Sequence, residues 1–216
     1  MALSTGLETT QINFANIENK GIEFEIKANI IDNKDWNWFV GFNIGKNKNK
    51  ITDIDAEYVS YPGSSYLGNT VIQEGKSLGL IYGYKTDGIF QTQEEVDRYA
   101  IQTQGNDPYN RTSAGDIKFK DLNNDGIIND KDRTYLGSPT PTWIFSMNNS
   151  FAWKGFDLEI FLQGAAGNKI YNANRASLEA MSVAQNQMTT VLDRWRGEGT
   201  SNSMPRAVFG DPNKNG

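Results

Sequence analysis

The sequence predicts an all-β fold, in which antiparallel strands form part of a transmembrane β-barrel and long extracellular loops carry short helices. Two observations predict it. Four segments of 11 or 12 residues alternate apolar and polar side chains, and the connections between them are alternately short and long. A period of two indicates a strand with one apolar and one polar face. Because a soluble β-sandwich alternates in the same way, strand length and connection length must decide between the two folds.

The predicted strands cover residues 21–31, 36–46, 142–153 and 156–166. Ile22, Phe24 and Ile26 share one face of the first strand, and the other three strands repeat this pattern. Asn149 is the one clear polar misfit on the apolar face of the third strand. Strands of globular proteins usually have about 5 to 6 residues, whereas membrane-crossing strands have about 9 to 11. The lengths therefore favour strands that cross a membrane.

The connections favour the same interpretation. Residues 32–35 and 154–155 join the strands of each pair, whereas residues 47–141 and 167–216 form long loops. Outer-membrane barrels have short periplasmic turns, long extracellular loops and aromatic girdles at both interfaces. Aromatic side chains flank both short turns here, namely Trp36, Trp38, Trp153 and Phe156. Since a membrane barrel needs at least about 8 strands to close, we expect residues 1–216 to be part of one barrel domain.

Composition excludes several classes of function. The 216 residues carry a net charge of -5, which does not favour a nucleic-acid partner. The chain has neither cysteine nor histidine, so disulfides, thiolate metal sites and Ser-His-Asp catalysis are excluded. Asp157 and Glu159 lie roughly 6 to 7 Å apart on a strand and could form the carboxylate pair of a glycosidase. Such pairs are far more often solvated surface, so we expect no enzyme.

Two short helices are predicted in the long loops. Thr92 and Glu95 have the spacing of a capping box, and residues 96–102 would continue the helix. In the second loop, apolar residues recur at helical spacing from Met188 to Trp195, and Gly197 would end that helix.

Residues 121–132 have the register of an EF-type calcium loop. Side-chain oxygens fall at positions 1, 3, 5, 9 and 12, a backbone carbonyl at position 7 and a glycine, Gly126, at position 6. The expected ligands are Asp121, Asn123, Asp125, Ile127 through its carbonyl, Asn129 and Asp132. Position 12 is Asp rather than Glu, and the preceding GDIKFK alternates like a strand, so dockerin-like loops are the closer analogy. We expect a structural Ca²⁺; the alternative is an Asx-rich turn that binds nothing.

Six motifs follow one another along nearly the whole chain: NKGIEFEI (19–26), GDIKFKDLNNDGIINDKDR (115–133), LGSPTPTW (136–143), FLQGAAGNKIYN (161–172), LDRWRGEG (192–199) and MPRAVF (204–209). Taken in this order, they resemble the C-terminal barrel region of SusC-like, RagA-type TonB-dependent receptors. The resemblance implies a barrel of about 22 strands with a plugged lumen. It also implies import of oligosaccharides or peptides across the bacterial outer membrane, with a SusD-like lipoprotein and TonB as partners. Which residues would bind the ligand is unknown.

A second hypothesis stays open from the sequence: a secreted, calcium-stabilised β-sandwich that binds carbohydrate. The two hypotheses differ in what the apolar strand faces contact. A barrel segment would place Trp38, Phe42, Phe145 and Ile160 against lipid or a neighbouring chain, whereas a sandwich would bury them in its own core.

Overall fold

A computed structural model describes residues 14–54, 59–61, 70–102, 111–211 and 213. The chain divides into two compact units. The first, the strand unit, comprises Met1–Ser60, Val71–Leu80 and Gly137–Ile170. The second, the loop unit, comprises Tyr61–Thr70, Ile81–Leu136 and Tyr171–Gly216.

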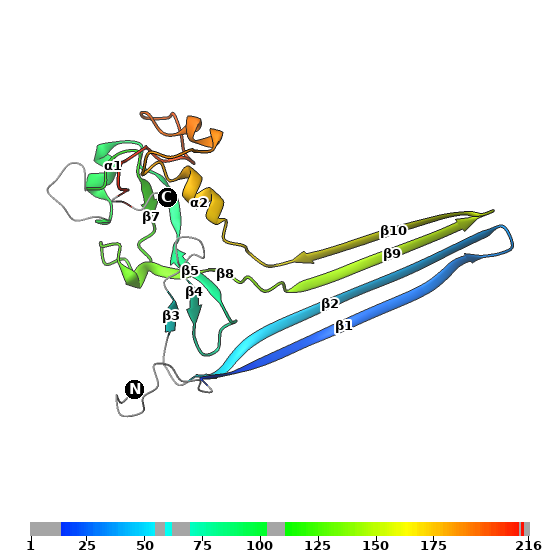
Figure 1. The fold of residues 1–216 in the computed structure, drawn as a ribbon. Coiled ribbons are helices and arrows are strands. Elements are labelled where there is room, and N and C mark those ends of the chain that lie inside the picture. The colour runs from blue at the N-terminus through cyan, green and yellow to red at the C-terminus, as the bar shows by residue number, and fades with distance from the viewer. Residues whose placement is uncertain (1–13, 55–58, 62–69, 103–110, 212, 214–216) are drawn as a thin grey trace, which may run out of the picture. The chain divides into compact units, whose positions relative to one another are not determined.

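The strand unit is built on one four-stranded antiparallel sheet with the order β1-β2-β9-β10 (Figure 1). Its strands are β1 (Ala15–Asp32), β2 (Trp36–Ile54), β9 (Trp143–Trp153) and β10 (Phe156–Ala166). The all-β, antiparallel prediction is confirmed. β9 and β10 end within one residue of the predicted bounds, but β1 and β2 are longer, with 18 and 19 residues. The loop predicted at 47–141 therefore begins only after Ile54.

Both short turns are explained by local chemistry. The side-chain oxygen of Asn33 accepts hydrogen bonds from the backbone N–H groups of Asp35 and Trp36, at 3.0 and 2.8 Å. Lys154 and Gly155 both have positive φ, 44° and 87°, as a two-residue type I′ hairpin turn requires. Each turn thus fixes the register of the two strands that it joins.

The remaining strands are short. One sheet has the order β3-β4-β5-β8, with β3 (Val59–Tyr61), β4 (Thr70–Ile72), β5 (Leu80–Tyr84) and β8 (Arg133–Gly137). Another pairs β6 (Thr86–Ile89) with β7 (Ile117–Phe119). The helices are α1 (Gln93–Arg98), α2 (Ala173–Glu179) and the 3-10 helices η2 (Asp130–Asp132) and η3 (Thr189–Asp193). None of the helices in the described ranges is both long and apolar enough to cross a membrane.

The helix predictions are confirmed only in part. Thr92 caps α1, since its hydroxyl accepts from the Glu95 N–H at 3.2 Å, but the Glu95 carboxylate accepts from the Gln91 N–H instead of completing a capping box. α1 ends at Arg98, not at residue 102. Within the stripe from Met188 to Trp195, only Thr189–Asp193 is helical, as the 3-10 helix η3, so the helix does not run on to Gly197; Val191 is its buried residue.

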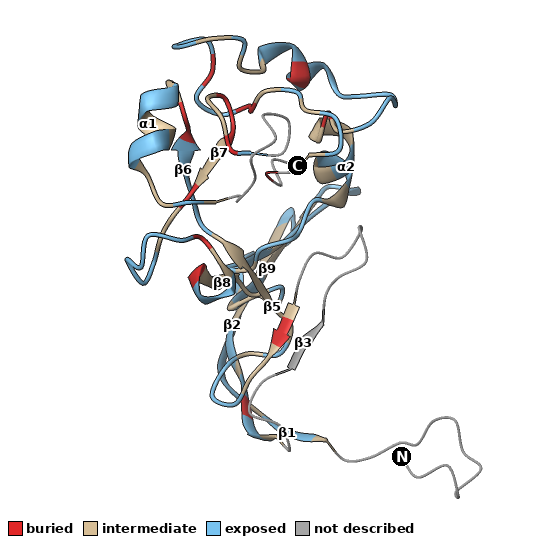
Figure 2. Cartoon of the chain, turned by 90° about the vertical axis from the view of Figure 1, so that its left-hand side faces the viewer, coloured by how far each residue is buried: buried red, intermediate tan, exposed pale blue. Residues whose placement is uncertain are grey.

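Burial is concentrated in the loop unit, where Phe90, Ile89 and Phe119 are buried around β6 and β7 (Figure 2). Met181, Val191 and Met204 form a second buried cluster. The long sheet is different: β1, β2, β9 and β10 are mostly half-buried or exposed. The strand unit therefore carries large apolar surfaces without a core on its main sheet.

Candidate functional site

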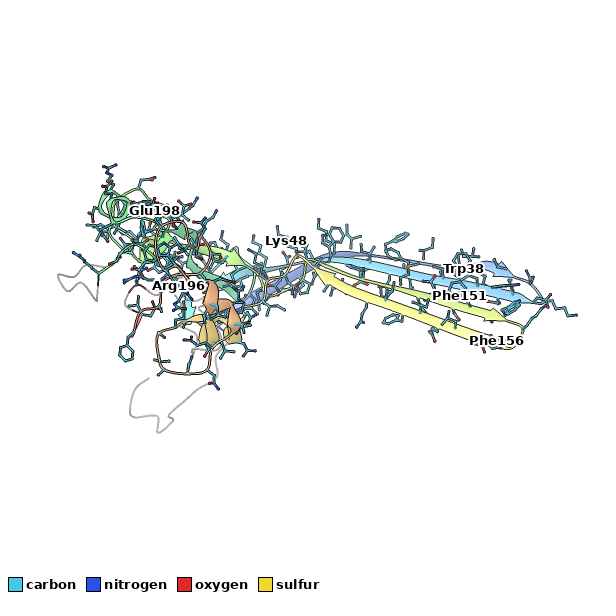
Figure 3. All side chains as sticks on the ribbon, turned by 90° about the horizontal axis from the view of Figure 1, so that it is seen from above. Trp38, Lys48, Phe151, Phe156, Arg196 and Glu198 are labelled. Carbon is cyan, nitrogen blue, oxygen red and sulfur yellow. The ribbon has the colours of Figure 1, made fainter. Side chains whose placement is uncertain are left out.

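One face of the long sheet, the outward face, is a continuous band of apolar side chains. The register places Phe24 beside Ile44 and Ile44 beside Phe145. The next rows are Ile26-Phe42-Met147-Leu162 and Ala28-Val40-Asn149-Ile160. Toward the turns, Trp38 stacks on Phe151 with ring centroids 5.4 Å apart (Figure 3). The alternation in the sequence therefore assigned these faces correctly, including Asn149 as the polar residue among them.

This band is not covered by other described residues. Phe145 is 39% exposed, Ile160 42% and Phe24 55%. Contiguous apolar surface of this extent marks an interaction with a membrane or another protein. The sandwich hypothesis required these faces to be packed into the protein's own core, and the exposure of the band argues against it.

Aromatic residues mark both ends of the band. At the turns, Trp153 lies 5.6 Å from Trp36 and 6.3 Å from Phe156, measured between ring centroids. At the other end, the Lys46 ammonium lies 5.0 Å above the ring of Trp143. Ten residue steps separate Trp36 from Lys46, about 33 Å at about 3.3 Å per residue. A strand tilt of about 40° reduces this to about 25 Å, the height of the apolar band of outer-membrane barrels.

The opposite face, the inward face, is mostly polar, although Ile144 and Phe161 also lie on it and are exposed. Lys27 pairs with Glu25 at 2.7 Å, and the Asn148 side-chain N–H donates to Glu159 at 3.1 Å. Asp157 and Glu159 are both exposed. Exposure and a hydrogen bond to Asn148 are typical of carboxylates on a solvated polar surface. This geometry does not favour Asp157 and Glu159 as the carboxylate pair of a glycosidase.

In the predicted metal loop, residues 121–132, backbone N–H groups donate to side chains of the expected ligand set. Gly126 has a φ of 81°, where a side chain would be strained. Its N–H donates to Asp121 Oδ2 at 2.8 Å. Asn123 Oδ1 accepts from the Asp125 N–H at 3.1 Å, and Asp125 Oδ1 accepts from the Ile127 N–H at 3.0 Å. Hydrogen bonds from the Asn123 side chain and the Ile127 backbone lower the pKa of Asp125, so this carboxylate is charged at neutral pH.

Two carboxylates of the loop differ in what they bind. Asp132 is fully buried, and its two oxygens accept from the N–H groups of Leu122 and Asn129 at 2.9 and 2.8 Å. Asp121 Oδ1 is also buried, yet it accepts no hydrogen bond from any described residue. Position 1 of the calcium register is a ligand position, so a buried carboxylate oxygen that lacks a hydrogen-bond donor there is suited to bind a cation. The residues thus fit Ca²⁺ in their chemistry.

The carboxylates of the loop are nevertheless not gathered at one point. In the described ranges, no three acidic side chains approach closely enough to hold a metal ion by themselves. Amide and carbonyl oxygens, the other members of the predicted ligand set, would have to complete the coordination. The loop is fixed to its surroundings by Ile128, which is buried. The Ile101 N–H donates to the Gly126 carbonyl and the Ile128 N–H donates to the Ile101 carbonyl, both at 2.9 Å.

A second constellation, which we call the motif junction, brings together three of the motifs that carry the resemblance. Asp116 of GDIKF is fully buried and accepts from Arg206 Nε and Nη2 of MPRAVF, at 2.7 and 3.1 Å. It also accepts from the Ser113 N–H at 2.8 Å. The Arg206 N–H donates to the Gly115 carbonyl at 2.8 Å. The ion pair thus joins residues 90 positions apart.

Trp195 of LDRWRGEG completes the motif junction. Gly115 has a φ of 91°, and a Cβ there would lie 2.4 Å from the Trp195 ring. The Gln91 side-chain oxygen accepts from Trp195 Nε1 at 3.3 Å and from the Gly199 N–H at 2.9 Å. Sequence reasoning missed this arrangement. The available signal was that Asp116, Trp195 and Arg206 all lie in motifs shared with one family.

Fold and faces together define the class of protein: a segment of an antiparallel β-barrel with one apolar and one polar face. The family follows from the similarity of the chain to known proteins. The chain is 32% identical over 207 residues to TonB-dependent receptor P3 of Formosa agariphila, covering 94% of this chain and 20% of that protein. It is 26% identical over 183 residues to TonB-dependent receptor SusC of Bacteroides thetaiotaomicron, covering 81% of this chain and 17% of that protein. The chain is thus homologous to one segment of the SusC-like TonB-dependent receptors.

Solved structures agree on the fold. The RagAB peptide transporter superposes with a TM-score of 0.66 and 19% identity, covering 98% of this chain and 21% of that one. The RagAB peptide importer in its open-open state gives 0.62 and 18%, covering 96% of this chain and 21% of that one. No family model matches the sequence. These curated relatives match the chain over most of its residues, but the chain spans only about a fifth of the relatives' own length.

Proposed function

We propose that this chain forms part of the barrel wall of an outer-membrane, TonB-dependent nutrient importer. In this proposal the outward face contacts lipid and the inward face lines the lumen. The importer takes up oligosaccharides or peptides and works with a SusD-like lipoprotein, as the resemblance to SusC and to the RagAB peptide transporter suggests.

One observation carries this proposal beyond the resemblance of sequences. The long sheet presents an exposed apolar band about 33 Å long along β2, from Trp36 to the row of Trp143. At the tilt of about 40° that barrel strands have, this length would span about 25 Å, the height that an outer-membrane barrel needs. The same strands turn charged and amide side chains to the other face, among them Glu25, Lys27 and Glu159. A lumen that conducts polar nutrients requires such a surface, whereas the interior of a soluble sandwich excludes it.

Uptake by whole cells tests this function. Cells that lack the full-length receptor should lose uptake of one labelled class of substrate, oligosaccharide or peptide, and regain it when the receptor is restored. Uptake should also stop in cells without TonB, and a SusD-like lipoprotein should co-purify with the receptor. Unchanged uptake of both classes in the deletion strain would contradict the proposal.

We also propose that residues 121–132 bind a structural Ca²⁺. Asp121 Oδ1 is the unused oxygen that supports this proposal. The ion would supply a fixed positive charge that offsets the repulsion among the loop carboxylates. Asp132, held by two backbone N–H groups, closes the loop. Through its hydrogen bonds to Ile101, an ordered loop also holds the segment that follows α1.

Removal of calcium is the matching experiment. In the full-length receptor, Ca²⁺ at tenfold its dissociation constant should stabilise the loop unit by about 1.4 kcal/mol relative to EDTA. Asp121→Asn keeps the acceptor for Gly126 but weakens the ligand, so it should abolish the Ca²⁺-dependent rise in melting temperature. Asp130→Asn is the control, because Asp130 lies outside the ligand register and its side chain is 84% exposed. If Ca²⁺ and EDTA give the same melting temperature, the loop is an Asx-rich turn only.

A further inference from the structure

Beyond the apolar band, the outward face of β1 and β2 becomes basic. Lys46 follows Ile44 on this face, and Lys48 and Lys50 come next at the same spacing of two residues. On β1 the register places Lys20 directly opposite Lys48, and Glu18 opposite Lys50. We call Lys20, Lys46, Lys48 and Lys50 the lysine patch. Figure 3 shows Lys48 far from Phe156, next to the ends of β9 and β10 that lie away from the short turns.

The lysine patch lies on the same face as the apolar band, not on the lumen side. The pairing of β1 with β2 shifts register only between Asn16 and Ile17 and between Asn29 and Ile31, so the faces do not exchange between Ile22 and Lys20. All four lysines are exposed. The other face of the extension is covered: Asn49 Oδ1 accepts from the Leu78 N–H at 2.9 Å, and Ile51 is buried.

The charges of the lysine patch are poorly balanced. Lys20 pairs with Glu18 at 2.7 Å, and Lys46 lies over the Trp143 ring. Lys48 has no carboxylate partner in the described part of the chain, and its neighbour across the strands is another lysine. Directly opposed like charges destabilise a sheet. An anion bound between these side chains would remove that repulsion.

We propose that the lysine patch binds the phosphate groups of a glycolipid in the outer leaflet of the membrane. This inference rests on the proposed function, because it needs the apolar band to face lipid. The patch begins at the row where the band ends and Trp143 lies, the depth at which lipid headgroups lie and at which Trp and Lys side chains concentrate. It belongs to the side of the long loops, which is the extracellular side of such barrels.

The spacing suits a phosphate. Directly opposed residues such as Lys20 and Lys48 have Cα atoms about 4.5 to 5.5 Å apart, and Lys46 lies about 6.6 Å from Lys48 along the strand. Three flexible ammonium groups can therefore converge on one headgroup, and Lys binds phosphate as a point charge. Apolar stems along the strand surface let each ammonium extend to the headgroup level.

The test uses the full-length receptor in phosphatidylcholine nanodiscs that contain either bisphosphorylated lipid A or its dephosphorylated form. The variant K20Q/K46Q/K48Q removes three charges from the lysine patch. The control K27Q/K34Q/K154Q removes three charges from the inward face and from the two turns. Lipid retained by the protein is counted by native mass spectrometry, and insertion of each variant is measured as its recovery in the outer-membrane fraction of cells.

We expect wild type and control to retain bisphosphorylated lipid A, and the patch variant to retain at least about tenfold less. The dephosphorylated lipid should be retained weakly by all three. Equal retention by the inserted patch variant and wild type would overturn the inference and leave the proposed function standing. Equal loss in patch variant and control would also overturn it, because net charge alone would then explain the effect. Failure of the wild type to reach the outer membrane would instead contradict the proposed function.

Discussion

Replacing Arg206 with leucine is expected to lower the free energy of local unfolding at the motif junction by about 3 kcal/mol. Breaking one partner of a buried ion pair costs about 3 to 5 kcal/mol. We expect the lower end because the Arg206 side chain is 24% exposed. Asp116, which is fully buried, would keep the Ser113 N–H as a donor but lose both guanidinium contacts.

Hydrogen–deuterium exchange of the full-length receptor measures this effect locally. The amides of residues 113–116 should exchange about a hundredfold faster in the variant. Arg175→Leu is the control: its pair with Glu179 is an i,i+4 contact, and its side chain is 61% exposed. Such surface pairs contribute about 0.5 kcal/mol or less. If both variants exchanged alike, the motif junction would not stabilise the loop unit.

The second large effect is expected at Phe42. It lies in the middle row of the outward face, between Ile26 and Met147. Phe42→Arg should cost about 2 to 4 kcal/mol if this row lies near the bilayer midplane, because a guanidinium would enter hydrocarbon. Urea titration of the full-length receptor refolded into phospholipid vesicles measures the cost.

Asn43→Arg is the matched control. Asn43 lies on the inward face, beside Glu25 and Ser146, so an arginine there faces polar groups and water. Its cost should stay below about 1 kcal/mol, the value for positions outside the apolar band. Equal costs at Phe42 and Asn43 would show that the two faces are wrongly assigned.

Alternation predicted the faces of the long sheet because period two is a local property of each strand. The pairing of β2 with β9 is not local, since about 90 residues lie between the two strands, and only the structure supplies it. The extension of β2 to Ile54 was also missed. Lys48, Asn49 and Lys50 are polar on both faces, so the strand continues without a visible alternation.

The same difference between local and distant residues applies to the candidate sites. A calcium register could be recognised at residues 121–132 because its spacing is contained in twelve residues, and Gly126 has a positive φ. That these residues form a metal site stays a prediction. The Asp116–Arg206 pair was not predicted, because no periodicity connects residues so far apart. Asp116 and Arg206 both lie in motifs that the chain shares with the family, but these motifs do not indicate that the two residues are in contact.

Spin labels on β2 test most directly whether the two faces meet different media. Single cysteines at positions 38 to 45, in a full-length receptor free of other cysteines, would each carry a nitroxide in a lipid bilayer. Collisions with molecular oxygen should peak at 38, 40, 42 and 44, and collisions with a water-soluble nickel complex at 39, 41, 43 and 45. Loss of this two-residue alternation, or frequent collisions with the nickel complex at positions 40 and 42, would mean that the apolar band does not contact hydrocarbon.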